Sequence, residues 1–154
     1  MKKTLVAVMA AALSLSSVAF AEPDESKDMM NLDLKKQGAW KPAWDPEAKV
    51  AKWENDKYMS SIVIRVVSDK LDSIDDLKAA APMMMQLGQA ITKVTEGPKT
   101  TKQGWWAVVE GDGTQDLIYV QKHGGKQLVC SASVKKGNIP KADAMKACES
   151  IKSK

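Results

Sequence analysis

Cys130 and Cys148 are the two cysteines of the chain and the residues whose chemistry the sequence specifies best. Cys130 alternates with Leu128 and Ala132 in a strand-like stretch, and Cys148 shares a helical face with Ile151. Two thiols on apolar surfaces that can meet form a disulfide in an oxidising compartment. Because C-x-x-C spacing is absent, we expect a structural bridge rather than a redox centre.

A catalytic or metal centre needs partner residues in a recognisable pattern, and the sequence contains none. His123 is the single histidine and precedes two glycines, so we interpret it as a turn residue. Asp75, Asp76, Glu110 and Asp112 could supply the acid and base of a small hydrolase, but acids this frequent pair by chance. GxSxG, GxGxxG and Walker A motifs are missing. We therefore expect no enzyme and assign no catalytic residue, metal ligand or cofactor.

Methionine and tryptophan are the two residue types in excess. The run Met83-Met84-Met85 could bind Cu(I) through thioethers, or it could fill an irregular core. The five tryptophans could supply the large pieces of a core, or they could bind a partner. Trp40 and Trp44 are the ones that we expect to be exposed and to form a partner-binding surface, since polar residues and Pro42 surround them.

The first 21 residues predict export. Lys2 and Lys3 precede an apolar stretch over residues 5–20, and small residues end at Ala21, directly before the charged run that starts at Glu22. This layout is typical of a bacterial secretory signal peptide, and a transmembrane helix would need roughly 20 apolar residues. We expect cleavage after Ala21, a periplasmic or secreted protein, and no membrane span in the mature chain.

Length and charge set the domain organisation and narrow the class of partner. The 154 residues include 23 Lys and Arg against 19 Asp and Glu, and removal of Lys2 and Lys3 with the signal peptide brings the chain closer to neutral. Basic and acidic residues are mixed along the chain, so we expect no nucleic-acid partner. We divide the chain into a signal peptide (1–21), a flexible N-terminal segment (22–38) and one domain (39–154).

Periodicity predicts the elements of that domain. Strands are expected over residues 50–54, 58–67, 94–100, 104–110, 117–121 and 128–134. Ser73 and Asp76 have the spacing of a capping box, so a helix should follow, which Pro82 either kinks or divides. A last helix should run over 141–153. Asp112-Gly113 and Gly124-Gly125 predict tight hairpin turns.

These elements predict a single α+β domain. One mostly antiparallel sheet of five to six strands should be packed by two or three helices, and the disulfide should staple the C-terminal helix to the last strand. Trp105 and Trp106 are neighbours in a strand and must point to opposite faces. We therefore expect both faces of the sheet to be covered.

Several segments together carry a family resemblance. They are a Trp- and Pro-containing first strand (40–44), the strand Ile62-Val63-Ile64, the Ser73 helix, the meander from Trp105, and Leu128-Val129-Cys130 leading to a helix at Ala142. This order resembles the Mog1/PsbP-like group of small α/β/α sandwiches. Members of that group are mainly binding or assembly proteins, so the resemblance implies a partner-binding role and assigns no residue.

The expected function is that of a non-catalytic binding or accessory protein of the bacterial cell envelope. Its partner would be a protein or another envelope component. Two alternatives remain open: a periplasmic protein that handles Cu(I) through methionine, and a small hydrolase.

Overall fold

The computed structural model describes residues 32–33, 40–47, 50–67, 70–84, 91–111, 113–123 and 125–153. The expected signal peptide (1–21) lies outside the described residues, as does the segment 22–38 apart from Leu32 and Asp33. None of the described helices is long and apolar enough to cross a membrane.

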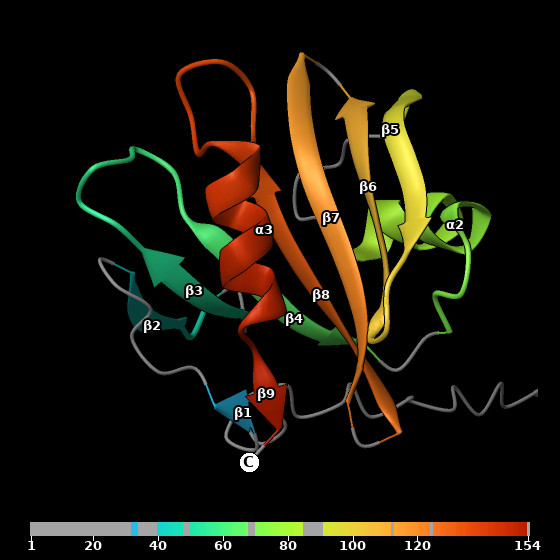
Figure 1. Ribbon diagram of the computed structural model, residues 1–154, viewed down its shortest axis with the longest axis horizontal. Coiled ribbons are helices and arrows are strands. Elements are labelled where there is room, and N and C mark those ends of the chain that lie inside the picture. The colour runs from blue at the N-terminus through green and yellow to red at the C-terminus, as the bar shows by residue number, and fades with distance from the viewer. Residues whose placement is uncertain are drawn as a thin grey trace, which may run out of the picture.

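Seven strands form one antiparallel sheet in the order β2-β3-β4-β8-β7-β6-β5 (Figure 1). The strands are β2 (Lys41–Asp45), β3 (Val50–Glu54), β4 (Ile62–Val67), β5 (Lys93–Thr100), β6 (Gly104–Gly111), β7 (Thr114–His123) and β8 (Lys126–Ser133). Two meanders, β2-β3-β4 and β5-β6-β7-β8, are joined where β4 pairs with β8. A second, two-stranded sheet pairs β1 (Leu32–Asp33) with β9 (Lys152–Ser153).

The α+β class is confirmed, but the main sheet has more strands than the five to six predicted. The strand that periodicity did not predict is β2, which lies in the Pro42-containing stretch (40–44) named as a first strand only in the family resemblance. Proline is tolerated there because β2 lies at the edge of the sheet, where a missing N–H group costs no ladder hydrogen bond. The strand expected over 58–67 begins only at Ile62, and it is an inner strand, as predicted.

Two helices, α2 (Ile74–Met84) and α3 (Lys141–Glu149), lie on opposite sides of the main sheet (Figure 1). Successive residues of β7 alternate between two groups of buried side chains, one on each face. On one face the sheet packs against Ala144, Ala147 and Ile151 from α3 and the turn after it. On the other face it packs against Leu71 and Leu77, from α2 and the connection before it.

Trp105 and Trp106 point to opposite faces, as predicted. Trp105 is buried in the core on the α2 face, and its indole N–H donates a hydrogen bond of 2.9 Å to the carbonyl oxygen of Leu71. Trp106 packs at the border of the core on the α3 face. Each large side chain is therefore covered by a different layer.

The capping box at the start of α2 is confirmed. The Asp76 N–H donates to Ser73 Oγ at 3.2 Å, and the Ser73 N–H donates to Asp76 Oδ2 at 2.9 Å. One helix continues through Pro82 to Met84, and residues 85–90 lie outside the described residues.

The prediction of a last helix over 141–153 is wrong at its C-terminal end. Helix α3 ends at Glu149, where the Ser150 hydroxyl and N–H both donate to the carbonyl oxygen of Ala147. Ile151 is then buried in the core, and Lys152–Ser153 form β9. Lys152 and Ser153 pair with β1 instead of continuing the helix. The periodicity of the C-terminal sequence does not predict this pairing.

Both predicted hairpin turns are present. Gly111 pairs with Thr114, and His123 pairs with Lys126, so each hairpin has a two-residue loop. Gly113 and Gly125 adopt positive φ angles of 81° and 83°, which tight hairpin turns require and glycine adopts without strain.

Candidate functional site

The predicted disulfide is present and belongs to the core. Cys130 of β8 and Cys148 of α3 are bridged, with 5.8 Å between their Cα atoms. Both residues are completely buried. Buried sulfur atoms are inaccessible to other thiols, so the bridge acts as a staple between helix and sheet.

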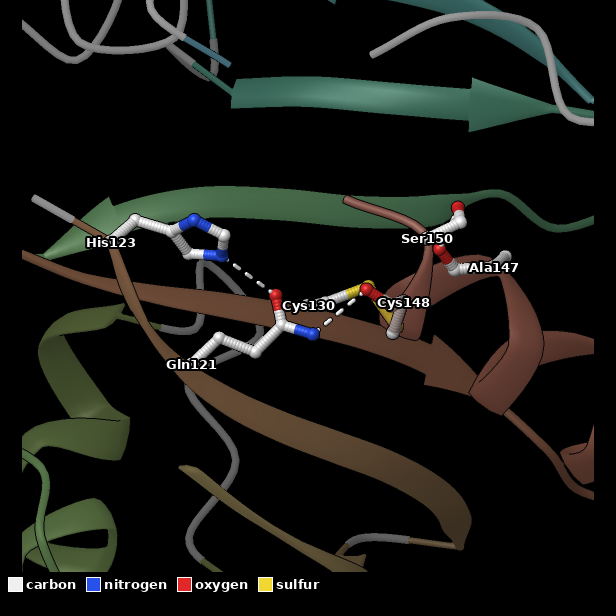
Figure 2. The surroundings of a disulfide bond; sticks show 6 residues. All are labelled: Gln121, His123, Cys130, Ala147, Cys148 and Ser150. Atoms are coloured by element: carbon white, nitrogen blue, oxygen red, sulfur yellow. Dashed lines mark hydrogen bonds between the residues drawn. A yellow bond between two sulfur atoms is a disulfide. The ribbon is translucent and has the colours of Figure 1, made fainter. Parts of the chain in front are cut away.

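A short hydrogen-bond chain leads from the bridge to the end of β7 (Figure 2). The amide Nε2 of Gln121 donates to the carbonyl oxygen of Cys148 at 2.8 Å, and His123 Nε2 lies 3.0 Å from Gln121 Oε1. Burial lowers the pKa of His123 below its ordinary value, so the ring is neutral at neutral pH. His123 is the last residue of β7, directly before the hairpin turn, and it is Gln121 that bonds to the C-terminal part of α3.

The two tryptophans expected to be exposed have different surroundings. Trp40 has an exposed fraction of only 7%, so the expectation that it is exposed is wrong. Its ring belongs to the core on the α3 face and stacks on Tyr58, which covers it. Trp44 has an exposed fraction of 41% and lies on the outermost strand.

Trp44 ends a row of residues that runs across the sheet to the disulfide. It pairs with Ala51, Ala51 pairs with Ile64, and Ile64 pairs with Cys130. Residues opposite each other in antiparallel strands share a face, so Trp44 lies on the α3 face. The other three residues of the row are buried, and Trp44 is the member that reaches solvent.

Met59 is the second exposed large apolar side chain, and sequence reasoning missed it. Within the described part of the chain, Trp44 and Met59 are the two such residues, and Met59 is fully exposed at 106%. It lies in the loop between β3 and β4, whose sequence has no motif that distinguishes Met59 from a core methionine. We call β2 together with this loop (residues 55–61) the Trp44 edge.

Polar contacts hold the Trp44 edge in place. Lys41 of β2 forms an ion pair of 2.6 Å with Asp56 of the loop, which joins the two parts of the edge. The Tyr58 hydroxyl donates to Asp143 of α3 at 2.9 Å, and the Tyr58 N–H donates to the Asn55 carbonyl oxygen at 2.9 Å. The residue directly before Met59 is therefore anchored to the helix.

A partly buried ion pair supports Trp44 from the other face of β2. Lys52 Nζ lies 2.5 Å from Asp45 Oδ2, and both side chains are less than a third exposed. Asp45 is the neighbour of Trp44 in β2, and Lys52 is the neighbour of Ala51 in β3. The pair ties the edge strand to the sheet where the indole is presented.

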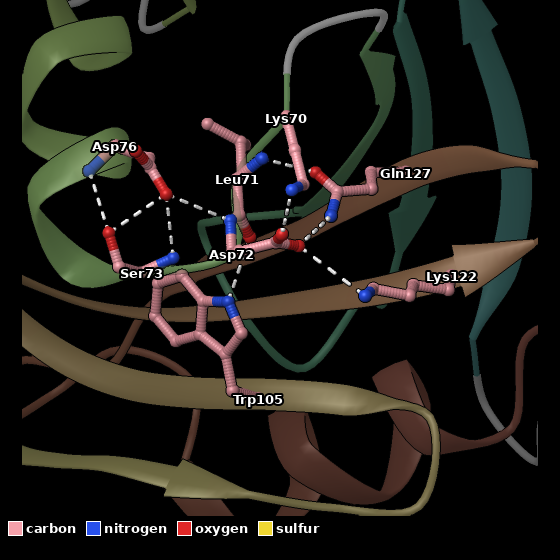
Figure 3. Close-up of polar contacts among 8 residues, drawn as sticks. All are labelled: Lys70, Leu71, Asp72, Ser73, Asp76, Trp105, Lys122 and Gln127. Atoms are coloured by element: carbon pink, nitrogen blue, oxygen red, sulfur yellow. Dashed lines mark hydrogen bonds and ion pairs between the residues drawn. The ribbon is translucent and has the colours of Figure 1, made fainter.

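A polar cluster fixes the connection between β4 and α2 (Figure 3). Gln127 of β8 accepts a hydrogen bond from the Leu71 N–H and donates to Asp72 Oδ1 at 3.1 Å. Lys70 and Lys122 form ion pairs with Asp72 at 3.0 Å and 3.4 Å. All these groups are engaged with one another, so the cluster positions α2 on the sheet.

The acids considered for a hydrolase are not assembled into a pair in the described structure. Asp75 forms an ion pair with Lys78 at 3.8 Å, and Asp76 caps α2. Trp105, near the start of β6, contacts the connection before α2. Glu110 lies five residues further along the same strand, at a distance of roughly 17 Å from Trp105. Asp112 lies outside the described residues.

Asp116 is a buried carboxyl group that sequence reasoning did not single out. Its exposed fraction is 8%, and the Thr114 hydroxyl donates to its Oδ2 at 2.8 Å. Burial raises the pKa of Asp116 above its ordinary value, while hydrogen bonds from Thr114 and Ser133 act in the opposite direction. Hydroxyl groups surround this carboxyl, and they supply no second acid or base.

No group of three or more His, Cys, Asp and Glu residues that could hold a metal ion occurs in the described part of the chain. The side chains of the run Met83-Met84-Met85 lie outside the described residues. Met145 of α3 packs against the core, which is the filling role considered for methionine.

A scan against protein-family models and searches of curated proteins and of solved structures found no match to this chain. The functional interpretation therefore depends on the site geometry.

Proposed function

We propose that this chain is a non-catalytic binding or accessory protein of the bacterial cell envelope, and that it recognises a protein partner through the Trp44 edge. The observation that carries the proposal is the exposure of Trp44 and Met59, while the other large apolar side chains of the described residues are covered. Cleavage of the chain after Ala21 and a periplasmic or secreted location belong to the same proposal.

The physical properties of these two side chains suit a binding surface. Tryptophan is the residue type most often found as an energetic hot spot, because it buries a large area with few rotatable bonds. Trp44 is already held on a strand, so binding would cost little additional ordering of the backbone. Met59 is flexible and can adapt to an irregular apolar surface.

The partner should bind by side-chain contact rather than by adding a strand. β2 is an edge strand, but Pro42 cannot donate a backbone hydrogen bond, and Lys41 adds a charge. The opposite edge, β5, contains Pro98 and register shifts between Val94 and Lys99. Both edges are poor templates for another strand, so we expect the partner to offer an apolar pocket for the indole.

The disulfide supports the proposed periplasmic or secreted location. A buried bridge between Cys130 and Cys148 is compatible with a secreted protein, because such bridges form and persist in oxidising compartments. The resemblance to the Mog1/PsbP-like group remains a part of this proposal, and it implies the same partner-binding role.

A capture experiment tests the proposal. Wild-type protein, Trp44→Ala, Met59→Ala and a control variant, Lys136→Ala, are immobilised and exposed to envelope extract. We expect wild type and the control to retain the same protein, and Trp44→Ala to retain it at least about tenfold more weakly, as for a hot-spot residue. Equal retention by all four proteins, or retention of nothing, would count against the proposal.

A further inference from the structure

Helix α2 covers only a part of its face of the main sheet. Figure 1 shows this helix behind the β5–β6 side of the sheet, away from β2 and β3. The buried core on this face includes Val67 of β4 and Val129 of β8, but Val63 of β4 is only half-buried and lies outside that core. The sheet around Val63 therefore reaches solvent.

Three half-buried polar side chains surround Val63 on this face. Lys52 of β3 and Ser131 of β8 pair with Val63 from its two sides, and Arg65 lies two residues further along β4. Side chains at these positions share a face, because residues alternate along a strand and paired residues lie side by side. Arg65 is diagonal to both Lys52 and Ser131, a spacing of roughly 7–8 Å that a long side chain can span. We call Lys52, Val63, Arg65 and Ser131 the Arg65 patch.

Arg65 is the cation of this patch that lacks a partner within the described part of the chain. It is the one arginine among the 23 lysine and arginine residues of the sequence, and it lies half-buried on an inner strand. Among the described residues, its guanidinium group forms no hydrogen bond, ion pair or ring contact. A partly buried charge without a hydrogen-bonding partner is unfavourable. An anion that binds to Arg65 would relieve this cost.

Neighbouring charges on β2 and β3 do not take the place of such an anion. Lys52 Nζ lies 2.5 Å from Asp45 Oδ2, so that carboxylate is engaged by the ammonium group. Glu54 follows Lys52 by two residues in β3 and lies on the side of Lys52 away from Arg65. The Ser131 hydroxyl can donate a hydrogen bond to an anion. Arg65 and Ser131 thus offer donors to the same incoming group.

We propose that the Arg65 patch binds a carboxylate side chain on an acidic segment of a protein partner. The guanidinium group presents two parallel N–H groups that match the two oxygens of a carboxylate, a geometry that lysine lacks. The Ser131 hydroxyl donates to the same carboxylate, and the apolar part of the segment covers Val63.

The position of the patch favours a protein segment over a small molecule. Sites for small molecules are concave and enclose most of the ligand, whereas the Arg65 patch lies on the face of a sheet. β4 and β8 are paired on both sides, so the segment binds through side chains and does not add a strand. Trp44 lies on the opposite face of the sheet, so the Arg65 patch is separate from the Trp44 edge and does not depend on its proposed role.

Nuclear magnetic resonance tests the proposal with the full chain as it exists after processing. Because the chain has one arginine, its proton–nitrogen correlation spectrum contains one arginine Nε–H signal. A peptide of alternating alanine and glutamate is titrated into the protein and compared with a peptide of alternating alanine and glutamine and with inorganic phosphate. The test variant is Arg65→Lys, which keeps the charge and removes the planar fork. The controls are Lys136→Gln, at an exposed lysine elsewhere, and Trp44→Ala.

We expect the glutamate peptide to shift the Arg65 Nε–H signal saturably, together with the backbone N–H signals of Val63 and Ser131. The backbone signals should show binding about tenfold weaker in Arg65→Lys and unchanged in both controls. These signals also show whether the variant is folded.

A wild-type Arg65 signal that does not respond to the glutamate peptide overturns the proposal. Equal affinity of Arg65→Lys, or equal binding of the glutamine peptide, also overturns it, because the planar fork or the carboxylate would then be irrelevant. A matching loss in either control attributes binding to net charge or to the Trp44 edge instead. Tighter binding of phosphate than of the glutamate peptide would assign the patch to phosphate and contradict the proposed partner.

Discussion

The indole ring of Trp40 stacks on the phenol ring of Tyr58, with 5.7 Å between the ring centroids and 23° between the ring planes. Four residues later, Trp44 has no such cover and reaches solvent. The same residue type thus serves as a core residue just before β2 and as the candidate binding residue within it. We therefore expect Trp40 to contribute to the stability of the fold and Trp44 to contribute to binding of the partner.

Replacement of the two tryptophans by alanine should therefore have opposite consequences. Trp40→Ala removes a buried aromatic side chain and should lower the free energy of unfolding by about 3–5 kcal/mol. Trp44→Ala removes a side chain that is already partly in water and should cost less than about 1 kcal/mol. Urea denaturation of both variants measures the two values. Similar losses in the two variants would contradict the assignment of Trp44 to a binding surface.

Removal of the disulfide should destabilise the fold without changing it. The bridge joins residues separated by 18 positions, so in the chain-entropy model its loss costs about 3 kcal/mol. We expect the variant Cys130→Ala/Cys148→Ala to unfold at a lower urea concentration and to keep the circular dichroism spectrum of wild type at low urea. A loss well below about 1 kcal/mol would show that the bridge does not constrain the chain as described.

Asp116 predicts a specific pH dependence of stability. Because burial raises its pKa in the folded state, folding favours the protonated carboxyl, and this contribution is lost as pH rises from the ordinary value of 3.8 through the raised folded pKa. At neutral pH the buried carboxylate is therefore unfavourable. We expect Asp116→Asn to be more stable than wild type at pH 7 and this advantage to shrink toward acidic pH.

Thermal unfolding across pH checks the Asp116 prediction. Glu54→Gln is a suitable control, because it removes a negative charge from an exposed side chain at the end of β3. If both variants gained the same stability, the effect would come from the change in net charge and not from burial of Asp116. A gain for Asp116→Asn that does not change with pH would also contradict the burial argument.

Local features of the fold were predictable from sequence because local residues determine them. The Ser73–Asp76 capping box and the two-residue hairpin loops depend on residues within a few positions of one another. By contrast, β9 depends on pairing with Leu32–Asp33, more than 100 positions away, and the same pairing explains why α3 ends early. Only the tertiary structure contains that information.

The candidate site was predictable in part. The disulfide followed from two cysteines on apolar faces, and the exposure of Trp44 followed from its polar flanks. Trp40 has similar polar neighbours, but it is buried in the core and stacks on Tyr58, and the local sequence does not reveal this difference. Met59 and Asp116 were missed because exposure in one case and burial in the other arise from how the loop and β7 lie in the folded chain.

The most direct test of the account places a photo-crosslinking amino acid at position 44, at position 59 or, as a control, at position 136. After irradiation in the envelope, we expect positions 44 and 59 to yield an adduct with the same protein and position 136 to yield none. Excess wild-type protein should suppress the adduct, and excess Trp44→Ala should not. Adducts that are absent at positions 44 and 59, or identical at all three positions, would contradict binding through the Trp44 edge.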